Sequence, residues 1–130
     1  MRTHAAADRA TSPEALLALY LDELARHHFS RSAQESARLI VPRFFSHLRE
    51  ERVRDVRAAR EEHVVSFAKR LSAHETRAGQ PLSHATKVHY LNRVKAFLRF
   101  LEEYEAQLAV AKRTHQLLGI WLDKKSSVKD

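Results

Sequence analysis

Apolar residues recur every three or four positions along four stretches of the chain, and this period predicts four amphipathic α-helices. The predicted helices cover residues 13–28, 33–51, 58–73 and 84–107. Their apolar faces are expected to form one core, with Tyr90, Phe97 and Tyr104 beside the last row. The predicted core positions are Leu17, Tyr20, Leu21, Leu24, Ala33, Ala37, Ile40, Phe44, Leu48, Val64, Phe67, Ala68, Leu71, Leu91, Val94, Leu98, Leu101 and Leu108.

Capping residues indicate where three of these helices begin. Ser12 is expected to cap the first helix, with Pro13 at the first helical position, where it loses no hydrogen bond. Ser32 and Glu35 match the capping box of a helix that begins at the next residue. Ser83 is expected to cap the fourth helix.

Two prolines and a glycine predict breaks in the helical pattern. Pro42 falls inside the second helix and removes one backbone hydrogen bond, so we expect a kink or a division near residues 39–40. Gly79 and Pro81 mark a loop before the fourth helix.

The segment 108–123 predicts a further helix or an extension of the fourth. Its apolar patch is too dense to stay exposed on a monomer, so it should fold back on the helices or dock into another surface. A second copy or a partner would then contact Leu117, Leu118 and Trp121. The patch consists of Leu117, Leu118, Ile120, Trp121 and Leu122.

Length and composition favour one helical domain. The 130 residues suffice for one core, and two Gly and three Pro leave little turn material for a β fold. We therefore predict an all-α protein, a compact four-helix bundle with an additional C-terminal helix or helical extension. We expect a disordered lead at 1–11, a helical domain at 12–107, a helical segment at 108–123 and a polar tail at 124–130.

Positive charge is concentrated in one part of the chain. The formal net charge of +7 favours a nucleic acid or another acidic surface as partner. Residues 76–101 contain five Lys or Arg, two His and no Asp or Glu, and the acids return at Glu102, Glu103 and Glu105. A helix with one apolar and one basic face is suited to a polyanion. The second helix should add a basic face with Arg31, Arg38 and Arg49.

Other chemistry finds little support in the sequence. The chain has no Cys, which suits the cytosol, where we expect the protein. No apolar run reaches the roughly 20 residues of a membrane span, and we expect no membrane partner. His84 and His89 are five residues apart, a poor spacing for two ligands on one helical face, so we expect no metal or other cofactor. No carboxylate pair, nucleophile with base or Gly-rich loop indicates an enzyme.

The order of these signals resembles the N-terminal core-binding domain of the tyrosine recombinases, the phage-integrase family, often called the SAM-like domain. The family's last helix follows the pattern LSxxTxxxxLxxLxxFFxFL. The likeness covers about residues 14–106. The matching positions of this chain are Leu82, Ser83, Thr86, Leu91, Val94, Phe97, Leu98, Phe100 and Leu101.

The resemblance implies a SAM-like orthogonal bundle that forms one half of a clamp around double-stranded DNA. In the family, the N-terminal halves of the second and fourth helices approach the major groove. Ser83, at a helix start, has a hydroxyl that can donate to a phosphate oxygen. The further DNA contacts implied position by position are Arg31, Ser32, Gln34, Arg38, Thr86, Lys87, His89 and Arg93.

This chain departs from the family pattern in three places. The catalytic Arg, His-x-x-Arg and Tyr boxes lie in a separate domain of the family and have no counterpart here. The Asn-Pro of the interdomain linker is missing, and Pro42 is not part of the pattern. We therefore expect DNA binding without DNA cleavage. The alternative is a helical protein-interaction module that uses residues 117–122.

Overall fold

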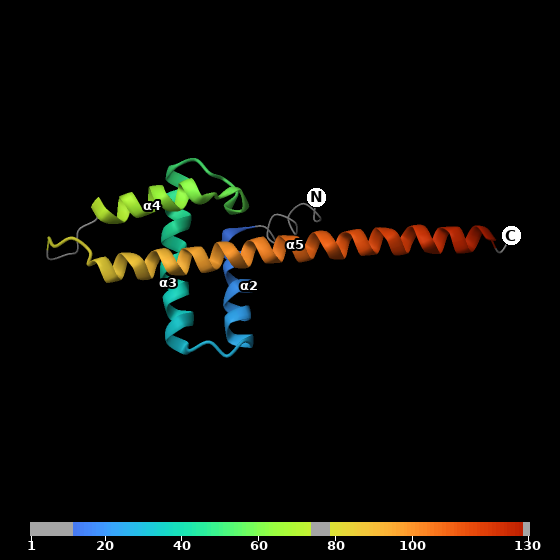
Figure 1. Ribbon diagram of the computed structural model, residues 1–130, viewed down its shortest axis with the longest axis horizontal. Coiled ribbons are helices and arrows are strands. Elements are labelled where there is room, and N and C mark those ends of the chain that lie inside the picture. The colour runs from blue at the N-terminus through green and yellow to red at the C-terminus, as the bar shows by residue number, and fades with distance from the viewer. Residues whose placement is uncertain (1–11, 74–78, 129–130) are drawn as a thin grey trace. The chain divides into compact units, whose positions relative to one another are not determined.

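The structure, a computed structural model, describes residues 12–73 and 79–128, with side chains up to residue 119 (Figure 1). Within these ranges the chain forms α-helices, one short 3-10 helix and no β-strand, so the all-α prediction is confirmed. The predicted lead at 1–11 lies outside the described residues. The elements are α2 (Pro13–Arg26), α3 (Arg31–Glu50), η1 (Val56–Ala58), α4 (Glu61–Ala73) and α5 (His84–Val128).

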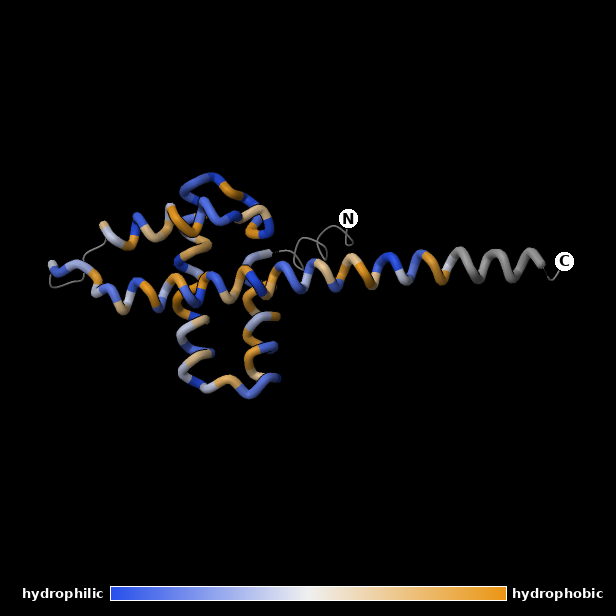
Figure 2. Tube along the Cα trace, in the orientation of Figure 1, coloured by the Kyte–Doolittle hydropathy of each residue, from blue (hydrophilic) through white to orange (hydrophobic). Residues whose placement is uncertain are grey.

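Two compact units make up the chain, Met1–Arg99 and Phe100–Asp130. The first unit contains α2, α3, η1, α4 and the beginning of α5. The second unit consists of the continuation of α5. Figure 2 shows hydrophobic and hydrophilic residues alternating along each helix, as the sequence period predicts.

Helix α2 begins where the sequence predicts. Ser12 has an extended backbone, and its Oγ accepts a hydrogen bond from the Ala15 N–H at 3.1 Å, with Pro13 in the first turn. The helix ends at Arg26, two residues before the predicted end. His28 then adopts a left-handed conformation with φ of 61°, and the Phe29 N–H donates to the Leu24 carbonyl at 2.9 Å. This pattern is the common way to satisfy the last carbonyls of a helix.

Helix α3 begins two residues earlier than predicted. Its cap is Ser30, whose Oγ accepts from the Ala33 N–H at 3.1 Å and whose carbonyl accepts from Gln34 N–H at 3.1 Å. The predicted capping box is therefore wrong. Ser32 is an exposed residue inside the first turn, and Glu35 forms an ion pair with Arg38 instead.

Pro42 does not divide α3, so of the two predicted outcomes, a kink or a division, the division is wrong. The helix continues through it as one element of 20 residues. Proline costs roughly 3 kcal/mol inside a helix, whereas burial of one large apolar side chain contributes about 1.5–3 kcal/mol. The residues on both sides of Pro42 are buried, so their packing outweighs the lost hydrogen bond. They include Ile40, Val41, Phe44 and Phe45.

The helix α4 begins at Glu61, three residues later than predicted, and the segment before it is irregular. Asp55 caps the 3-10 turn η1, since its Oδ1 accepts from the Arg57 N–H at 2.9 Å. Arg52, after α3, is the second non-glycine residue with a positive φ, 62°. The left-handed backbone conformation costs an L-residue about 1–2 kcal/mol. In this chain, which has few glycines, His28 and Arg52 adopt that conformation.

The core of the first unit is built around aromatic rings. Phe97 of α5 is completely buried and meets Tyr20 of α2 and Phe45 of α3 edge to face, each with ring centroids 5.5 Å apart. Phe44 of α3 meets Phe67 of α4 in the same manner at 5.4 Å. Edge-to-face pairs contribute about 0.5–1.5 kcal/mol each beyond the burial of their area. These contacts join all four helices of the unit.

Most of the predicted core positions are buried, with one shift on α2. Its buried face carries Leu16, and the predicted Leu17 and Leu21 are only half-buried. Leu91, Leu98 and Ala68 are also half-buried, and Leu108 is exposed. The predicted positions that are buried are Tyr20, Leu24, Ala33, Ala37, Ile40, Phe44, Leu48, Val64, Phe67, Leu71, Val94 and Leu101.

The second unit is a single helix from Phe100 to Val128, so the prediction that the fourth helix stops at residue 107 is wrong. Its alternative, an extension of that helix, is confirmed, and the extension includes most of the predicted polar tail. Leu117 and Leu118 are exposed, at 59% and 53%. The side chains of Ile120, Trp121 and Leu122 lie outside the described residues.

Candidate nucleic-acid interface

Polar and basic side chains bring the beginning of α5 against α3. His89 Nε2 lies 3.3 Å from Ser36 Oγ. Arg43 Nη1 donates to the Tyr90 hydroxyl at 3.0 Å, and its guanidinium lies 5.4 Å from the centroid of the same ring. Ser36 and Arg43 are about two turns apart on α3, whereas their partners are adjacent on α5. The two helices therefore cross steeply, as Figure 1 also shows.

We call these residues, together with Lys87, the α3–α5 crossing. Lys87 precedes Tyr90 by three residues, so the two side chains are neighbours on the surface of α5. Arg43 is exposed, and Lys87, His89 and Tyr90 are half-buried. Arg43 thus lies over the Tyr90 ring, and Lys87 lies about one turn before Tyr90 on α5. Arg43 is a basic residue that sequence reasoning missed, because no pattern within α3 indicates which residue pairs with a tyrosine 47 positions away.

The beginning of α5 is capped as predicted. Ser83 Oγ accepts from the Thr86 N–H at 3.1 Å, and the Ser83 carbonyl accepts from the Lys87 N–H at 3.1 Å. The hydroxyls of Ser83 and Thr86 also lie 2.9 Å apart. A capped helix start carries the positive end of the helix dipole, which favours an anion such as phosphate.

The candidate residues at the beginning of α3 have different surroundings. Arg31 and Ser32 are exposed. Gln34 Nε2 donates to the Phe29 carbonyl at 3.0 Å, so this amide holds the turn between α2 and α3. Arg38 forms an ion pair with Glu35 at 3.0 Å, and both side chains are largely exposed. Exposed pairs of this kind contribute about 0–1 kcal/mol, so the pair leaves Arg38 able to exchange Glu35 for a phosphate.

Arg31 and Arg38 do not share the face of α3 that meets the beginning of α5. Ser32, in contrast, precedes Ser36 by four residues and lies on the same side as Ser36. Arg38 follows Ser36 by two residues, which puts them roughly 160° apart around α3. Arg31 is seven residues before Arg38 and therefore lies on the same side as Arg38. The structure brings Ser36 and Arg43 against α5, and leaves Arg31 and Arg38 on another flank of α3.

Arg93 is a residue at the edge of the core. Its side chain is half-buried, and its Nε is buried without a hydrogen-bond partner among the described residues. Burial raises the pKa of the Tyr20 phenol, and the charge of Arg93 opposes this by lowering that pKa. The guanidinium is therefore close enough to Tyr20 to influence its pKa, and the half-buried Arg93 is less accessible to a large anion than the exposed Arg43.

The charge of the first unit is concentrated at this part of α5. Residues 12–73 carry eleven Lys or Arg and nine Asp or Glu, so their charges nearly cancel. From residue 79 to residue 101 no acidic residue occurs. The basic residues in that stretch are Lys87, Arg93, Lys95 and Arg99, and the last two are exposed.

A second polar cluster joins the end of α3 to α4. His47 is buried, and its Nε2 lies 2.9 Å from Glu51 Oε1 and 3.1 Å from Ser66 Oγ. Burial lowers the pKa of His47, and the carboxylate of Glu51 partly opposes this effect. Arg70 Nη2 donates to Glu50 Oε1 at 2.9 Å across the same junction. The cluster fastens two helices together, and sequence reasoning did not single out His47 among nine histidines.

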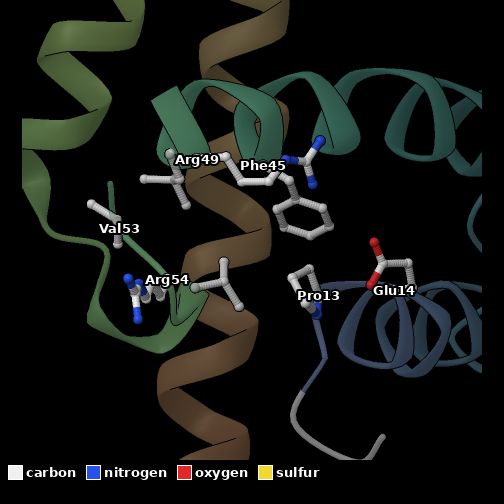
Figure 3. A pocket seen from close by; sticks show the side chains of 8 residues that line it. Pro13, Glu14, Phe45, Arg49, Val53 and Arg54 are labelled. Atoms are coloured by element: carbon white, nitrogen blue, oxygen red, sulfur yellow. The ribbon is translucent and has the colours of Figure 1, made fainter. Parts of the chain in front are cut away.

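A small hollow of about 280 Å³ lies elsewhere on the first unit. Figure 3 shows Pro13 and Glu14 from the start of α2 on one side and Phe45 and Arg49 from α3 above them. Val53, Arg54 and other residues of the segment after α3 complete the lining. The lining has one carboxylate and two guanidinium groups, and it includes no residue of the α3–α5 crossing.

The described part of the chain contains no group of three or more His, Cys, Asp or Glu that could hold a metal ion. Among the described helices, none has the length and apolar character needed to cross a membrane. No family model, no curated protein and no solved structure matches this chain. The resemblance to the core-binding domain of tyrosine recombinases therefore rests on the residues quoted for it, and it stays a prediction.

Proposed function

We propose that the first unit binds double-stranded DNA without cutting it, and that the α3–α5 crossing contacts the sugar-phosphate backbone. The observation that carries this proposal is the distribution of charge. The beginning of α5 has cations and no carboxylate, and Arg43 of α3 lies beside it. Lys and Arg neutralise phosphates and release the counterions that surround DNA, which provides affinity without sequence preference.

Each residue of the crossing has a role in this proposal. Arg43 is held by Tyr90 through a hydrogen bond and by its position over the ring, so it loses little freedom when it meets a phosphate. Lys87 acts as a point charge near the start of α5. His89 adds a ring nitrogen that can donate a hydrogen bond to a phosphate oxygen. Arg31 and Arg38 lie on the other flank of α3. Substitution of these two residues therefore tests from which side DNA approaches α3.

Binding of the full chain to duplex DNA tests the proposal. We expect a fluorescein-labelled duplex of random sequence to gain anisotropy on titration with the protein at 50 mM salt. If four phosphates are contacted, the affinity should fall about 150-fold between 50 and 200 mM salt, because its logarithm falls by about 0.9 per phosphate for each unit of log salt. No binding at 50 mM salt would refute the proposal.

A second candidate function is protein–protein interaction through the second unit. The observation in its favour is the exposure of Leu117 and Leu118 on a helix whose described side chains at positions 106–119 are all exposed. Truncation after residue 107 separates the two functions. A truncated chain that stays folded and binds DNA as well as the full chain would show that residues 108–130 are not needed for DNA binding.

A further inference from the structure

The exposed continuation of α5 lacks a partner that a helix of its kind needs. Every described residue from 106 to 119 is exposed, so no face of this stretch is covered. Isolated helices are marginal in water, and most helices in proteins are stabilised by packing of an apolar face. The stretch nevertheless has exposed large apolar side chains, namely Leu108, Val110, Leu117 and Leu118.

Residues of this stretch follow the spacing of a coiled coil. Tyr104, Leu108, Ala111, His115 and Leu118 are separated by four, three, four and three residues. This average of 3.5 residues keeps one seam facing a partner helix along its whole length. The same spacing runs back along the sequence through Leu101, Phe97 and Val94. We call residues 104, 108, 111, 115 and 118 the α5 seam.

We propose that the α5 seam pairs with the α5 seam of a second copy of this chain, with the two helices antiparallel. The inference deepens the second candidate function by naming the partner, and it is independent of DNA binding. With Leu108 of one copy opposite Ala111 of the other, a large side chain fills the space beside a small one. In the same register Tyr104 lies opposite His115, and each contact occurs twice because the pair is symmetric. Leu118 would lie opposite Leu101, which is already buried, so the paired part of the seam runs from Tyr104 to His115.

Charge complementarity selects this antiparallel arrangement. Glu105 and Lys112 occupy the same flank of the seam, one residue after Tyr104 and Ala111. In antiparallel pairs, residues of this flank face each other across the seam. The register above then places Glu105 of each copy opposite Lys112 of the other, which gives two opposite-charge pairs. Gln107 and Thr114, both uncharged, face each other on the other flank.

A parallel pair would lack these features. Ala111 would lie against Ala111 and leave a gap, and His115 would lie against His115. Residues 107 and 112 would then be neighbours, which offers Lys112 no carboxylate. The antiparallel pair therefore satisfies size and charge together. The paired part of the seam is only about three turns long, so we expect a reversible, concentration-dependent dimer.

Sedimentation velocity of the full chain over a hundredfold range of concentration tests the proposal. We expect the sedimentation coefficient to rise with concentration. Leu108→Glu should abolish this rise, whereas Val110→Glu should leave it unchanged, because Val110 is 65% exposed and lies off the seam. Circular dichroism should find both variants folded. A chain that stays monomeric throughout, or equal effects of the two variants, would overturn the proposal.

A charge exchange tests the antiparallel direction. Glu105→Lys and Lys112→Glu should each weaken the dimer, because each puts like charges opposite one another. The double variant should restore the wild-type association, since every pair is then opposite in charge again. Failure of the double variant to restore it would overturn the antiparallel register. DNA anisotropy measured on the same variants keeps the two functions apart, because loss of the dimer with unchanged DNA affinity leaves the DNA proposal intact.

Discussion

Removal of two cations at the α3–α5 crossing should weaken DNA binding by a predictable amount. We take the double variant Arg43→Gln and Lys87→Gln, which removes two charges of the crossing without adding acids. Each lost phosphate contact should reduce the steepness of log affinity against log salt by about 0.9. A slope of about 0.9 means that one contact raises the affinity about eightfold at 0.1 M salt relative to 1 M salt. Loss of two contacts should therefore weaken binding at 0.1 M salt about 60-fold.

The matched control is the double variant Arg54→Gln and Lys69→Gln, which has the same net charge. Both of its residues are exposed and outside the crossing, Arg54 in the segment after α3 and Lys69 on α4. Anisotropy titrations at four salt concentrations give the affinity and its slope for each protein, and thermal unfolding verifies that each is folded. Equal losses in the two double variants would mean that total charge, and not the crossing, determines binding, and would refute the assignment. A larger loss for Arg31→Gln with Arg38→Gln would move the contact to the other flank of α3.

Four predictions concern stability. Phe97→Ala should cost about 3–5 kcal/mol in urea unfolding, because the ring is fully buried; a loss below 1 kcal/mol would contradict this core. Ser30→Ala should lower the free energy of unfolding by about 0.5–2 kcal/mol, and Ser32→Ala should leave it almost unchanged. The reverse order would refute the assignment of Ser30 as the cap of α3. Arg52→Gly should stabilise by about 1 kcal/mol in the same assay, since φ is positive there, and a destabilised variant would count against the strain. Burial lowers the pKa of His47, so the unfolded chain takes up the proton first. Stability should therefore be lost as the pH falls from about 6.5 through the folded-state pKa, and His47→Gln should remove that loss.

The helical fold could be predicted well from the sequence, because a helix satisfies its backbone hydrogen bonds within its own segment. The spacing of apolar residues therefore located α2, α3, α4 and the beginning of α5 to within a few residues. Ser12 and Ser83 were identified as caps for the same local reason. The buried face of α2 was misjudged by one position, because Leu16, Leu17, Tyr20 and Leu21 offer two overlapping rows.

The choice of cap for α3 needed the tertiary structure. Ser30 and Ser32 offer the same hydroxyl two residues apart, and local chemistry does not distinguish them. The turn from α2 decides, because the Phe29 N–H is bound to Leu24 and the Gln34 amide to the Phe29 carbonyl. Pro42 is a similar case, since the packing of the residues around it keeps the helix continuous.

The sequence by itself determined the presence of the helices, most of their buried positions and the acid-free beginning of α5, because each depends on residues within one segment. Only the tertiary structure decided which flank of α3 lies beside α5. The period of apolar residues locates the core face of each helix, but it does not tell which of the two flanks beside that face meets another helix. In the structure, the flank of α3 with Ser36 and Arg43 contacts the beginning of α5. The basic flank with Arg31 and Arg38 therefore lies apart from the residues of α5 with which the sequence had grouped it.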